Sequence, residues 1–361
     1  MDRIVKVGII GCGGIANGKH MPSLSKVPNV QMVAFCDIIP ERAEKAKAKF
    51  GTPDAKTYTD YKELLADKEI EVVHVLTPNR EHADITVDAL YAGKHVMCEK
   101  PMAKTAADAK RMLDAAKATG KKLTIGYQHR QKPQSIYAKK YIDSGAIGEI
   151  YYANCLAIRR RGTPNWGVFL DEEAQGGGPI IDIATHSLDL TLYLMNNYEP
   201  EMVVGKTHKK LEHPEAGNIW GDNGVSTTPL EEAACALVLM KNGATIMLET
   251  SWALNTDREI QEGSCRLCGS RAGLMVEENG LKLNKVDLDR AVNTNVNTNA
   301  GGVAFYSGSS SSPAATEARR WIDAIINDTD PVVLPEQACV VSQILEAIYV
   351  SSQTGKAVYF E

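Results

Sequence analysis

The sequence contains no long apolar run. Although 44% of its 361 residues are hydrophobic, no stretch approaches the roughly 18 consecutive apolar residues that a membrane helix requires. The opening Met1-Asp2-Arg3 leads directly into a strand-like segment, without the apolar core and cleavage site of a signal peptide. We therefore predict no membrane partner and a cytoplasmic location.

The sequence also lacks a concentration of positive charge. Its 40 Lys and Arg residues are outnumbered by 45 Asp and Glu residues, for a net charge of -5, and no basic run is long enough for a nucleic-acid-binding arm. Nucleic acid is therefore not an expected partner. The composition is that of an ordinary globular protein, and the length suits two domains.

Cysteine spacing gives little support for a metal site or a disulfide framework. The eight cysteines are scattered, mostly inside apolar strand-like runs, which is typical of buried, reduced thiols. Cys265 and Cys268 have metal-like spacing, but no second CxxC or His pair accompanies them, and a structural zinc site needs four ligands. We predict no metal and place both cysteines in a strand that turns at Gly269.

A glycine-rich turn follows the first predicted strand, residues 4–10. This β-branched run is typical of a central parallel strand, and the next residues form the pattern G-x-G-x-x-A. In such a pattern the first glycine permits a tight turn, the second lets the backbone approach a pyrophosphate, and the helix amides hold the anion. Alone the pattern is weak, because glycine-rich turns also occur for steric reasons. The residues concerned are Gly11, Gly13, Gly14, Ile15 and Ala16.

An acidic residue ends the second predicted strand at the spacing expected for a ribose ligand. Strand 30–36 leads into Asp37, whose carboxylate can accept hydrogen bonds from ribose hydroxyls but would repel a 2′-phosphate. Asp37 therefore favours NAD over NADP; the nearest cation, Arg42, lies in the following helix. The alternative is that Asp37 only caps the helix that begins near Pro40.

Strands and helices alternate through residues 1–126, which predicts a Rossmann domain with a doubly wound parallel sheet of six strands. Polar residues follow two of these strands at the carboxyl edge, where ligands bind in such sheets. Thr77, Pro78, Asn79 and His82 follow strand 72–76. Glu99-Lys100-Pro101 follow strand 95–98, and the proline ends the strand so that Lys100 is delivered to the edge.

The alternation ends after Gly126, and residues 127–361 are predicted to form an α+β domain with a large, mainly antiparallel open sheet. Strands are expected over 149–160, 201–208, 231–239 and 245–252, with further pieces between 266 and 286, and helices over 133–144, 316–327 and 335–354. Two segments rich in Gly, Asn and Ser, 217–229 and 293–312, are predicted to be long loops of the kind that form lids or contact arms.

A second glycine-rich segment, 176–178, leads into a predicted helix that carries Asp182 and His186. Residues at i and i+4 share a helix face, so the carboxylate and the imidazole can touch. An aspartate beside a histidine fixes the ring's tautomer and makes it a better base. The same pair could instead satisfy polar groups in a buried structural helix, and spacing alone leaves both interpretations open.

Taken together, these three motifs resemble the glucose–fructose oxidoreductase, inositol dehydrogenase and MocA family along essentially the whole chain. The resemblance implies that Lys100, Asp182 and His186 form the catalytic set, and that the second domain presents its sheet to the nicotinamide. It also implies a secondary alcohol of a sugar, sugar derivative or cyclitol as substrate, and assembly into dimers or tetramers through that sheet. Ala16 in place of the third glycine is an accepted variant.

The resemblance implies further site residues. For the cofactor, NAD, it adds Glu99, Lys100 and Gln128 to the residues of the glycine turn and the carboxyl edge. For the substrate the predicted set is Lys100, His129, Arg159, Arg161, Asn165, Trp166, Asp182 and His186. The alternatives are that the arginines form a solvated strand end and that Trp166 belongs to the core.

The sequence thus predicts an NAD-dependent oxidoreductase that transfers hydride between the nicotinamide and a secondary alcohol. His186 would act as general base, Lys100 would stabilise the developing alkoxide, and Asp182 would orient His186. A glycosidase of the same family, which works by transient ring oxidation and elimination, is the competing enzyme class. A redox-silent NAD sensor is disfavoured, because all three residues are present.

Overall fold

The computed structural model describes residues 3–257, 261–298 and 312–361, and the chain divides into two compact units. Unit 1 comprises Met1–Gln131 and Ser311–Cys339, and unit 2 comprises Lys132–Ser310 and Val340–Glu361. The sequence-based division assigned everything after residue 126 to the second domain. The structure returns helix α9 (Pro313–Ile326) to unit 1, because Trp321 and Ile322 are buried in that unit's core.

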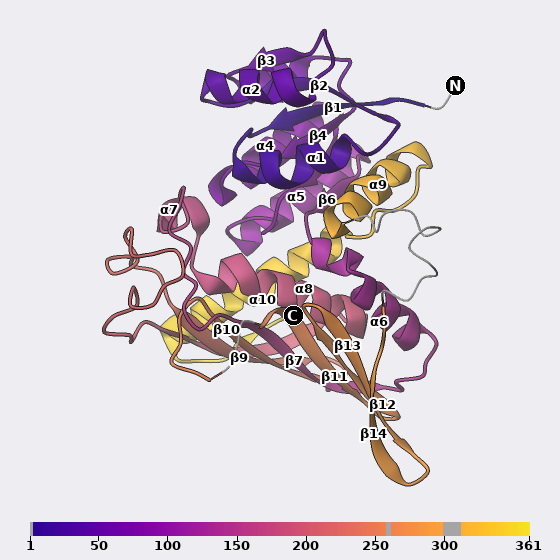
Figure 1. Cartoon of the computed structure of the whole chain (residues 1–361), viewed down its shortest axis with the longest axis vertical. Helices are drawn as coiled ribbons and strands as arrows, with labels where there is room; N and C mark the ends of the chain where they lie inside the picture. The colour runs from indigo at the N-terminus through magenta and orange to yellow at the C-terminus, as the bar shows by residue number, and fades with distance from the viewer. Residues whose placement is uncertain (1–2, 258–260, 299–311) are drawn as a thin grey trace. The chain divides into compact units, whose positions relative to one another are not determined.

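Unit 1 is built on a six-stranded sheet in the order β3-β2-β1-β4-β5-β6, and all its strand pairs run parallel. The predicted doubly wound sheet is therefore confirmed (Figure 1). Its strands are β1 (Val5–Ile10), β2 (Val30–Cys36), β3 (Lys56–Tyr58), β4 (Val72–Val75), β5 (His95–Cys98) and β6 (Leu123–Ile125). Its helices include α1 (Met21–Leu24), α2 (Pro40–Phe50), α3 (Tyr61–Ala66), α4 (His82–Tyr91) and α5 (Ala106–Thr119).

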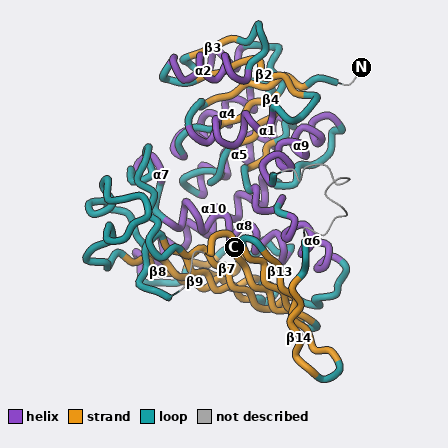
Figure 2. Tube along the Cα trace, in the orientation of Figure 1, coloured by secondary structure: helices purple, strands orange, loops and turns teal. Residues whose placement is uncertain are grey.

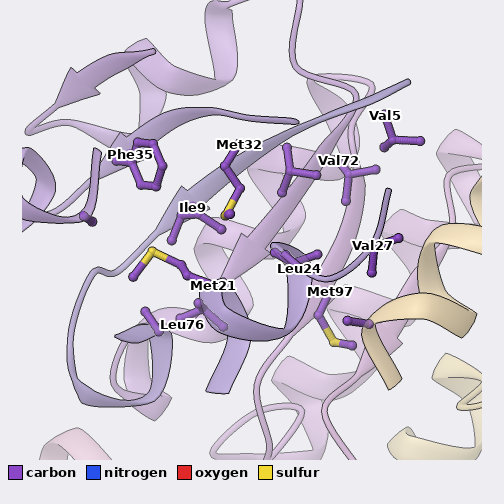
Figure 3. Packing of buried hydrophobic residues seen from close by; sticks show 14 of the residues in the cluster. Val5, Ile9, Met21, Leu24, Val27, Met32, Phe35, Val72, Leu76 and Met97 are labelled. Atoms are coloured by element: carbon purple, nitrogen blue, oxygen red, sulfur yellow. The ribbon is translucent and has the colours of Figure 1, made fainter. Parts of the chain in front are cut away.

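The two faces of this sheet follow from the alternation of β1. Val5, Val7 and Ile9 point into one core together with residues of α1 and α9, and Figure 3 shows Ile9 among the side chains of that cluster. Gly8 points to the other face, where a Cβ would lie 3.0 Å from Leu64 of α3. Helices therefore cover both faces, as a parallel sheet requires.

Unit 2 is built on a nine-stranded sheet in the order β14-β13-β12-β11-β7-β10-β9-β8-β15. Among the described strands the pair β7 and β10 is parallel, and the other neighbours are antiparallel, so the predicted mainly antiparallel sheet is confirmed. The strands are β7 (Ile150–Ile158), β8 (Pro200–His208), β9 (Ala233–Met240), β10 (Thr245–Ser251), β11 (Gln261–Gly269), β12 (Ala272–Glu277), β13 (Gly280–Asp287), β14 (Arg290–Asn295) and β15 (Val358–Tyr359).

The two faces of this larger sheet differ in composition. Paired residues in one row, including Ile246, Ala153 and Leu267, are fully buried and form the face against which α8 (Thr185–Met195) packs (Figure 2). The adjacent row faces the other way and mixes apolar with polar residues; Met247, for example, is 37% exposed. The remaining helices of the chain are α6 (Pro133–Asp143), α7 (Glu172–Gln175) and α10 (Pro335–Thr354).

Two predicted helices begin differently from the expectation. After each glycine-rich segment the chain forms a π-helical turn, η1 (Ala16–His20) before α1 and η4 (Ile180–Ala184) before α8. The predicted loop 293–312 is also interrupted, because β14 extends to Asn295, while residues 299–311 lie outside the described part of the chain.

The cysteines agree with the predicted reduced state. All eight fall within the described residues, and each is a free thiol. Cys265 and Cys268 lie on β11, which ends at Gly269 as expected. None of the described helices combines the length and apolarity needed to cross a bilayer.

Candidate active site

The glycine turn has the geometry that its sequence predicts. Gly11 has a φ of +91°, and a Cβ there would lie 2.6 Å from the carbonyl oxygen of Leu76, so only glycine fits. A Cβ on Gly13 or Gly14 would meet no atom within 4 Å, which leaves the turn open on one side. Ala16 is fully buried in the core of unit 1. The turn therefore leaves room for a pyrophosphate beside backbone amides.

Asn17, which sequence reasoning missed, stabilises the glycine turn through its side chain. The side-chain nitrogen Nδ2 of Asn17 donates to the backbone carbonyl oxygens of Cys12 at 2.8 Å and Gly13 at 2.9 Å. Asparagine commonly bonds to nearby backbone in this way, so its place after a glycine pattern was the available signal.

Asp37 is fixed at the end of β2 by backbone donors. Its Oδ2 accepts from the amide of Cys12 at 2.9 Å, and its Oδ1 accepts from the amide of Ile39 at 2.9 Å. Helix α2 begins at Pro40 without a side-chain cap, so the capping alternative does not describe this carboxylate. Burial, together with the charge of Asp37, raises the pKa of Cys12 to about 12, so this thiol stays protonated at neutral pH.

The loop after β4 carries the hydroxyl group of Thr77. Thr77 Oγ1 is buried and has no hydrogen-bond partner among the described residues. This hydroxyl lies in the same unit as the open glycine turn and the fixed Asp37 carboxylate. Together they suit a dinucleotide whose adenosine ribose carries no 2′-phosphate. Pro78 and Asn79 follow Thr77, and both are partly buried.

His82 connects two loops of the carboxyl edge. Its imidazole is fully buried, with Nε2 3.0 Å from the carbonyl oxygen of Thr77 and Nδ1 2.8 Å from that of Pro101. Burial lowers the pKa of His82, although both carbonyls oppose this effect. These contacts make His82 a brace between the loop of Thr77 and the loop of Lys100.

A buried lysine organises the residues around Glu99. Lys19, from the π-helical turn η1, is a member of the site that sequence reasoning missed, because no local pattern marks it. Its Nζ lies 2.7 Å from Glu99 Oε1, 2.8 Å from Gln128 Oε1 and 3.1 Å from Glu317 Oε2. Two predicted cofactor residues, Glu99 and Gln128, are thus held by one ammonium group.

Glu99 in turn holds the backbone at Lys100, the residue predicted to be catalytic. Its Oε1 also lies 2.7 Å from His20 Nε2, and its Oε2 accepts from the amide of Lys100 at 3.0 Å. The peptide bond between Lys100 and Pro101 is cis. The backbone of Lys100 is therefore tied to a buried ionic cluster in the Rossmann unit.

The charges of this cluster are unequal. Burial tends to raise the pKa of Glu99, but Lys19 and His20 outweigh it, and the pKa ends well below its usual value. Burial raises the pKa of Glu317, and Lys19 opposes this rise only in part. His74, whose Nδ1 lies 3.1 Å from His20 Nδ1, has a pKa lowered by burial and by the neighbouring cations. The main ion pair of the cluster is therefore Lys19 with Glu99.

The other predicted residues of unit 1 lie on a short 3-10 helix, η3 (Gln128–Gln131). Gln128 and His129 are both partly buried there. The neighbouring Arg130 is fully buried and donates to the carbonyl oxygen of Val332 at 3.0 Å, which anchors η3 within the unit.

In unit 2, Asp182 lies within η4, and His186 lies in the first turn of α8. Asp182 Oδ2 accepts from the indole nitrogen of Trp252 at 3.0 Å and lies 3.8 Å from a guanidinium nitrogen of Arg159. The His186 side chain is largely buried, at 9% exposure. Arg159 is thus part of the Asp182 site, and the alternative of a solvated strand end does not apply to it.

The glycines before this helix make room for the side chains of Glu231 and Tyr349. A Cβ on Gly177 would lie 2.0 Å from the Tyr349 hydroxyl, and one on Gly178 would lie 2.5 Å from the Glu231 carbonyl oxygen. Glu231 Oε1 accepts from the Tyr349 hydroxyl at 2.7 Å and from the amide of Gly178 at 3.0 Å. Burial raises the pKa of Glu231, against these donors. Glu231 and Tyr349 therefore fix the start of the helix. Sequence reasoning missed both residues, because their contacts join distant parts of the chain.

The remaining predicted substrate residues of unit 2 lie in one loop after β7, which is hydrogen-bonded to a second loop that contains Ala216 and Trp220. Arg161 donates through Nε to the carbonyl oxygen of Ala216 at 3.1 Å. Asn165 is buried and donates to the carbonyl oxygen of Trp220 at 2.8 Å. Trp166 is 48% exposed, so the alternative that it belongs to the core does not apply. The structure thus places Lys100 and the cofactor residues in unit 1, and Asp182, His186 and these loop residues in unit 2.

This fold and these sites define an NAD-binding oxidoreductase, and the comparisons with known proteins agree. A model of an oxidoreductase family with an NAD-binding Rossmann fold matches residues 5–127, and a model of the GFO/IDH/MocA C-terminal domain matches residues 136–275. The chain belongs to the GFO/IDH/MocA family of oxidoreductases.

Two relatives and one solved structure illustrate the range of this family. A D-glucoside 3-dehydrogenase from Escherichia coli (strain K12) is 31% identical over 365 residues, 98% of this chain and 97% of that relative. An inositol 2-dehydrogenase from Salmonella typhimurium is 42% identical over 146 residues, 40% of this chain and 43% of that relative. A levoglucosan dehydrogenase in complex with NADH and levoglucosan has the same fold, with a TM-score of 0.83 and 23% identity over 99% of both chains.

Proposed function

We propose that this enzyme is an NAD-preferring dehydrogenase that oxidises a secondary ring hydroxyl of a sugar, with D-glucosides as the first class to test. The observation that carries the proposal is Lys100 at the carboxyl edge of the NAD-binding sheet, held by Glu99 beside the glycine turn. The similarity to a D-glucoside 3-dehydrogenase over 98% of the chain supports the substrate class.

The cofactor would be held by residues whose geometry suits its parts. The glycine turn offers amides to the pyrophosphate, and Asp37 offers a fixed carboxylate to the ribose. A bound 2′-phosphate would meet Asp37 as a like charge, which supports the preference for NAD. NAD, when bound, supplies the hydride acceptor.

The protein's own residues would manage the proton and the developing charge. His186 would take the hydroxyl proton, and the Lys100 ammonium would stabilise the alkoxide oxygen that forms. Asp182, held by Trp252 and Arg159, would keep His186 oriented. The relatives named above are dehydrogenases, and no observation favours the glycosidase, so we do not retain that alternative.

Two further proposals concern the setting of the enzyme. The partly exposed sheet face around Met247 supports assembly into a dimer or tetramer through unit 2. Eight free cysteines suit a reducing compartment, which supports a cytoplasmic location.

A substrate screen with matched variants tests the proposed function. Purified enzyme with NAD should form NADH with at least one member of a panel of D-glucose, methyl and phenyl β-D-glucosides, levoglucosan and myo-inositol. Lys100→Met and His186→Ala should each lower kcat by about 100-fold or more. Lys110→Met and His213→Ala replace exposed residues and should leave kcat unchanged. Aglycone release without net NADH, or full activity in both site variants, would refute the proposal.

A further inference from the structure

The four tryptophans of the chain fall into two groups. Trp252 and Trp321 are buried in the cores, at 1% and 3% exposure. Trp166 and Trp220 are 48% and 41% exposed, and their rings lie edge to face with centroids 4.8 Å apart. Two adjacent exposed indoles form an apolar surface patch of the kind that marks a binding site.

Buried amides hold the two loops that carry this indole pair, Trp166 and Trp220. Asn165 donates to the carbonyl oxygens of Trp220 and Gly221 at 2.8 and 2.9 Å. Asn218 accepts from the amide of Thr163 at 2.8 Å and donates to its carbonyl oxygen at 3.1 Å. Asn165 and Asn218 are each 9% exposed. These hydrogen bonds fix the two loops that carry the exposed rings relative to each other.

Arg159 connects the indole pair to the proposed catalytic site. Its guanidinium carbon lies 5.5 Å from the centroid of the Trp220 ring, and its NH1 lies 3.8 Å from Asp182 Oδ2. The Arg159 side chain is only 11% exposed. One guanidinium thus contacts both the face of Trp220 and the carboxylate of Asp182.

We propose that the indole pair is a subsite for the group attached to the oxidised sugar: an aromatic aglycone or a second pyranose ring of a glycoside. This inference rests on the proposed function. An aromatic ring, or the C–H face of a pyranose, can pack on an indole. Arg159 lies over the Trp220 ring and also reaches Asp182 of the proposed catalytic site, so the indole pair suits a group attached to the substrate better than a protein partner. The enzyme would therefore prefer glycosides with a ring-bearing aglycone to free monosaccharides or cyclitols.

Kinetics of a Trp220 series test the subsite. For phenyl β-D-glucopyranoside and cellobiose, Trp220→Ala should raise KM about tenfold with kcat little changed, because a contact made equally in the ground and transition states is lost. For D-glucose, which has no second ring, the KM change should be at most about twofold. Trp220→Phe should recover most of the affinity, and Tyr137→Ala, a matched control at 42% exposure, should change neither constant. Equal KM changes for all three sugars, or none, would overturn the subsite.

A binding measurement separates failure of the subsite from failure of the proposed function. Saturation-transfer NMR with the His186→Ala variant should show the phenyl protons of phenyl β-D-glucopyranoside in contact with the protein, and Trp220→Ala in that background should remove the contact. If the wild-type enzyme forms no NADH with any sugar but this contact is seen and lost as stated, the dehydrogenase assignment fails and the subsite stands. Absence of binding overturns the subsite. So does a change in sedimentation mass on Trp220→Ala, because the patch would then be a subunit interface.

Discussion

Replacing Lys19 by Met tests whether the buried ion pair of Lys19 and Glu99 stabilises the protein. Lys19 Nζ lies 2.7 Å from Glu99 Oε1, in a site where both side chains are about nine-tenths buried. Breaking a buried ion pair by removing one partner costs about 3–5 kcal/mol, because the remaining charge stays buried. Glu317 has a raised pKa and can take up a proton. Since only Glu99 keeps its charge, we expect the lower end, about 3 kcal/mol.

The measurement is thermal unfolding of Lys19→Met beside Lys110→Met, which removes an exposed lysine paired with Asp114. The first should lower the unfolding midpoint by roughly 6–12 °C, whereas the control should change it little, because exposed pairs contribute under about 0.5 kcal/mol. KM for NAD should also rise in Lys19→Met, because Gln128 loses its donor.

The pH dependence of this loss gives a second criterion. The pKa of Glu99 is depressed below its usual 4.5, so its contribution to stability is present above pH 4.5 and is lost as the pH falls through the folded-state value. The difference between wild type and Lys19→Met should therefore be full at pH 7 and shrink below about pH 4.5. A loss no larger than that of Lys110→Met, or one that persists undiminished at pH 3, would refute the assignment of a buried ion pair.

Three further predictions concern the cofactor, the thiols and a histidine. kcat/KM with NAD should exceed that with NADP at least roughly tenfold, and Asp37→Ser with Ile38→Arg should narrow the gap; equal wild-type values would contradict the role of Asp37. Elemental analysis should find no stoichiometric zinc, and replacing Cys265 and Cys268 by Ser should leave metal content unchanged. Burial and nearby cations lower the pKa of His95 from 6.5 to about 4, so its stabilising effect should be present above pH 6.5 and lost towards pH 4; His95→Asn should flatten that slope, and an NMR titration near 6.5 would contradict it.

Much of the fold could be predicted because its signals are local. The predicted helix 335–354 has the bounds that the structure shows for α10, and α2 begins at Pro40, where a helix start was expected, since proline and glycine mark helix ends within a few residues. The glycine turn and the position of Lys100 after β5 also follow from neighbouring residues. The alternation of strands with helices predicted the parallel sheet, and the strands that follow one another along the chain predicted the mainly antiparallel one.

The contacts that support the site could not be predicted, because they join distant parts of the chain. Lys19 is 80 positions from Glu99 and 109 from Gln128, and periodicity carries no information over such separations. Trp220 belongs to a segment that sequence reasoning could describe only as a long loop. Its position beside Trp166 depends on hydrogen bonds such as that of Asn165, 55 positions away.

A double-mutant cycle on Asp182 and His186 separates two roles of the aspartate. In Asp182→Asn the amide oxygen can still accept from Trp252, but the charge that faces Arg159 is lost. If Asp182 serves proton transfer only by orienting His186, Asp182→Asn should lower kcat less than His186→Ala. The double variant should then have nearly the kcat of His186→Ala alone.

KM should behave differently in the same cycle. The released Arg159 should disturb the face of Trp220, so KM for phenyl β-D-glucopyranoside should rise in Asp182→Asn and rise by the same factor in the His186→Ala background. The effect of Asp182→Asn on KM should thus not depend on His186, whereas its effect on kcat should. The reason is that the carboxylate contacts Arg159 and also lies one helical turn before His186. If the kcat losses multiply instead, Asp182 acts on the substrate independently of His186, and the pairing inferred from their four-residue spacing is wrong.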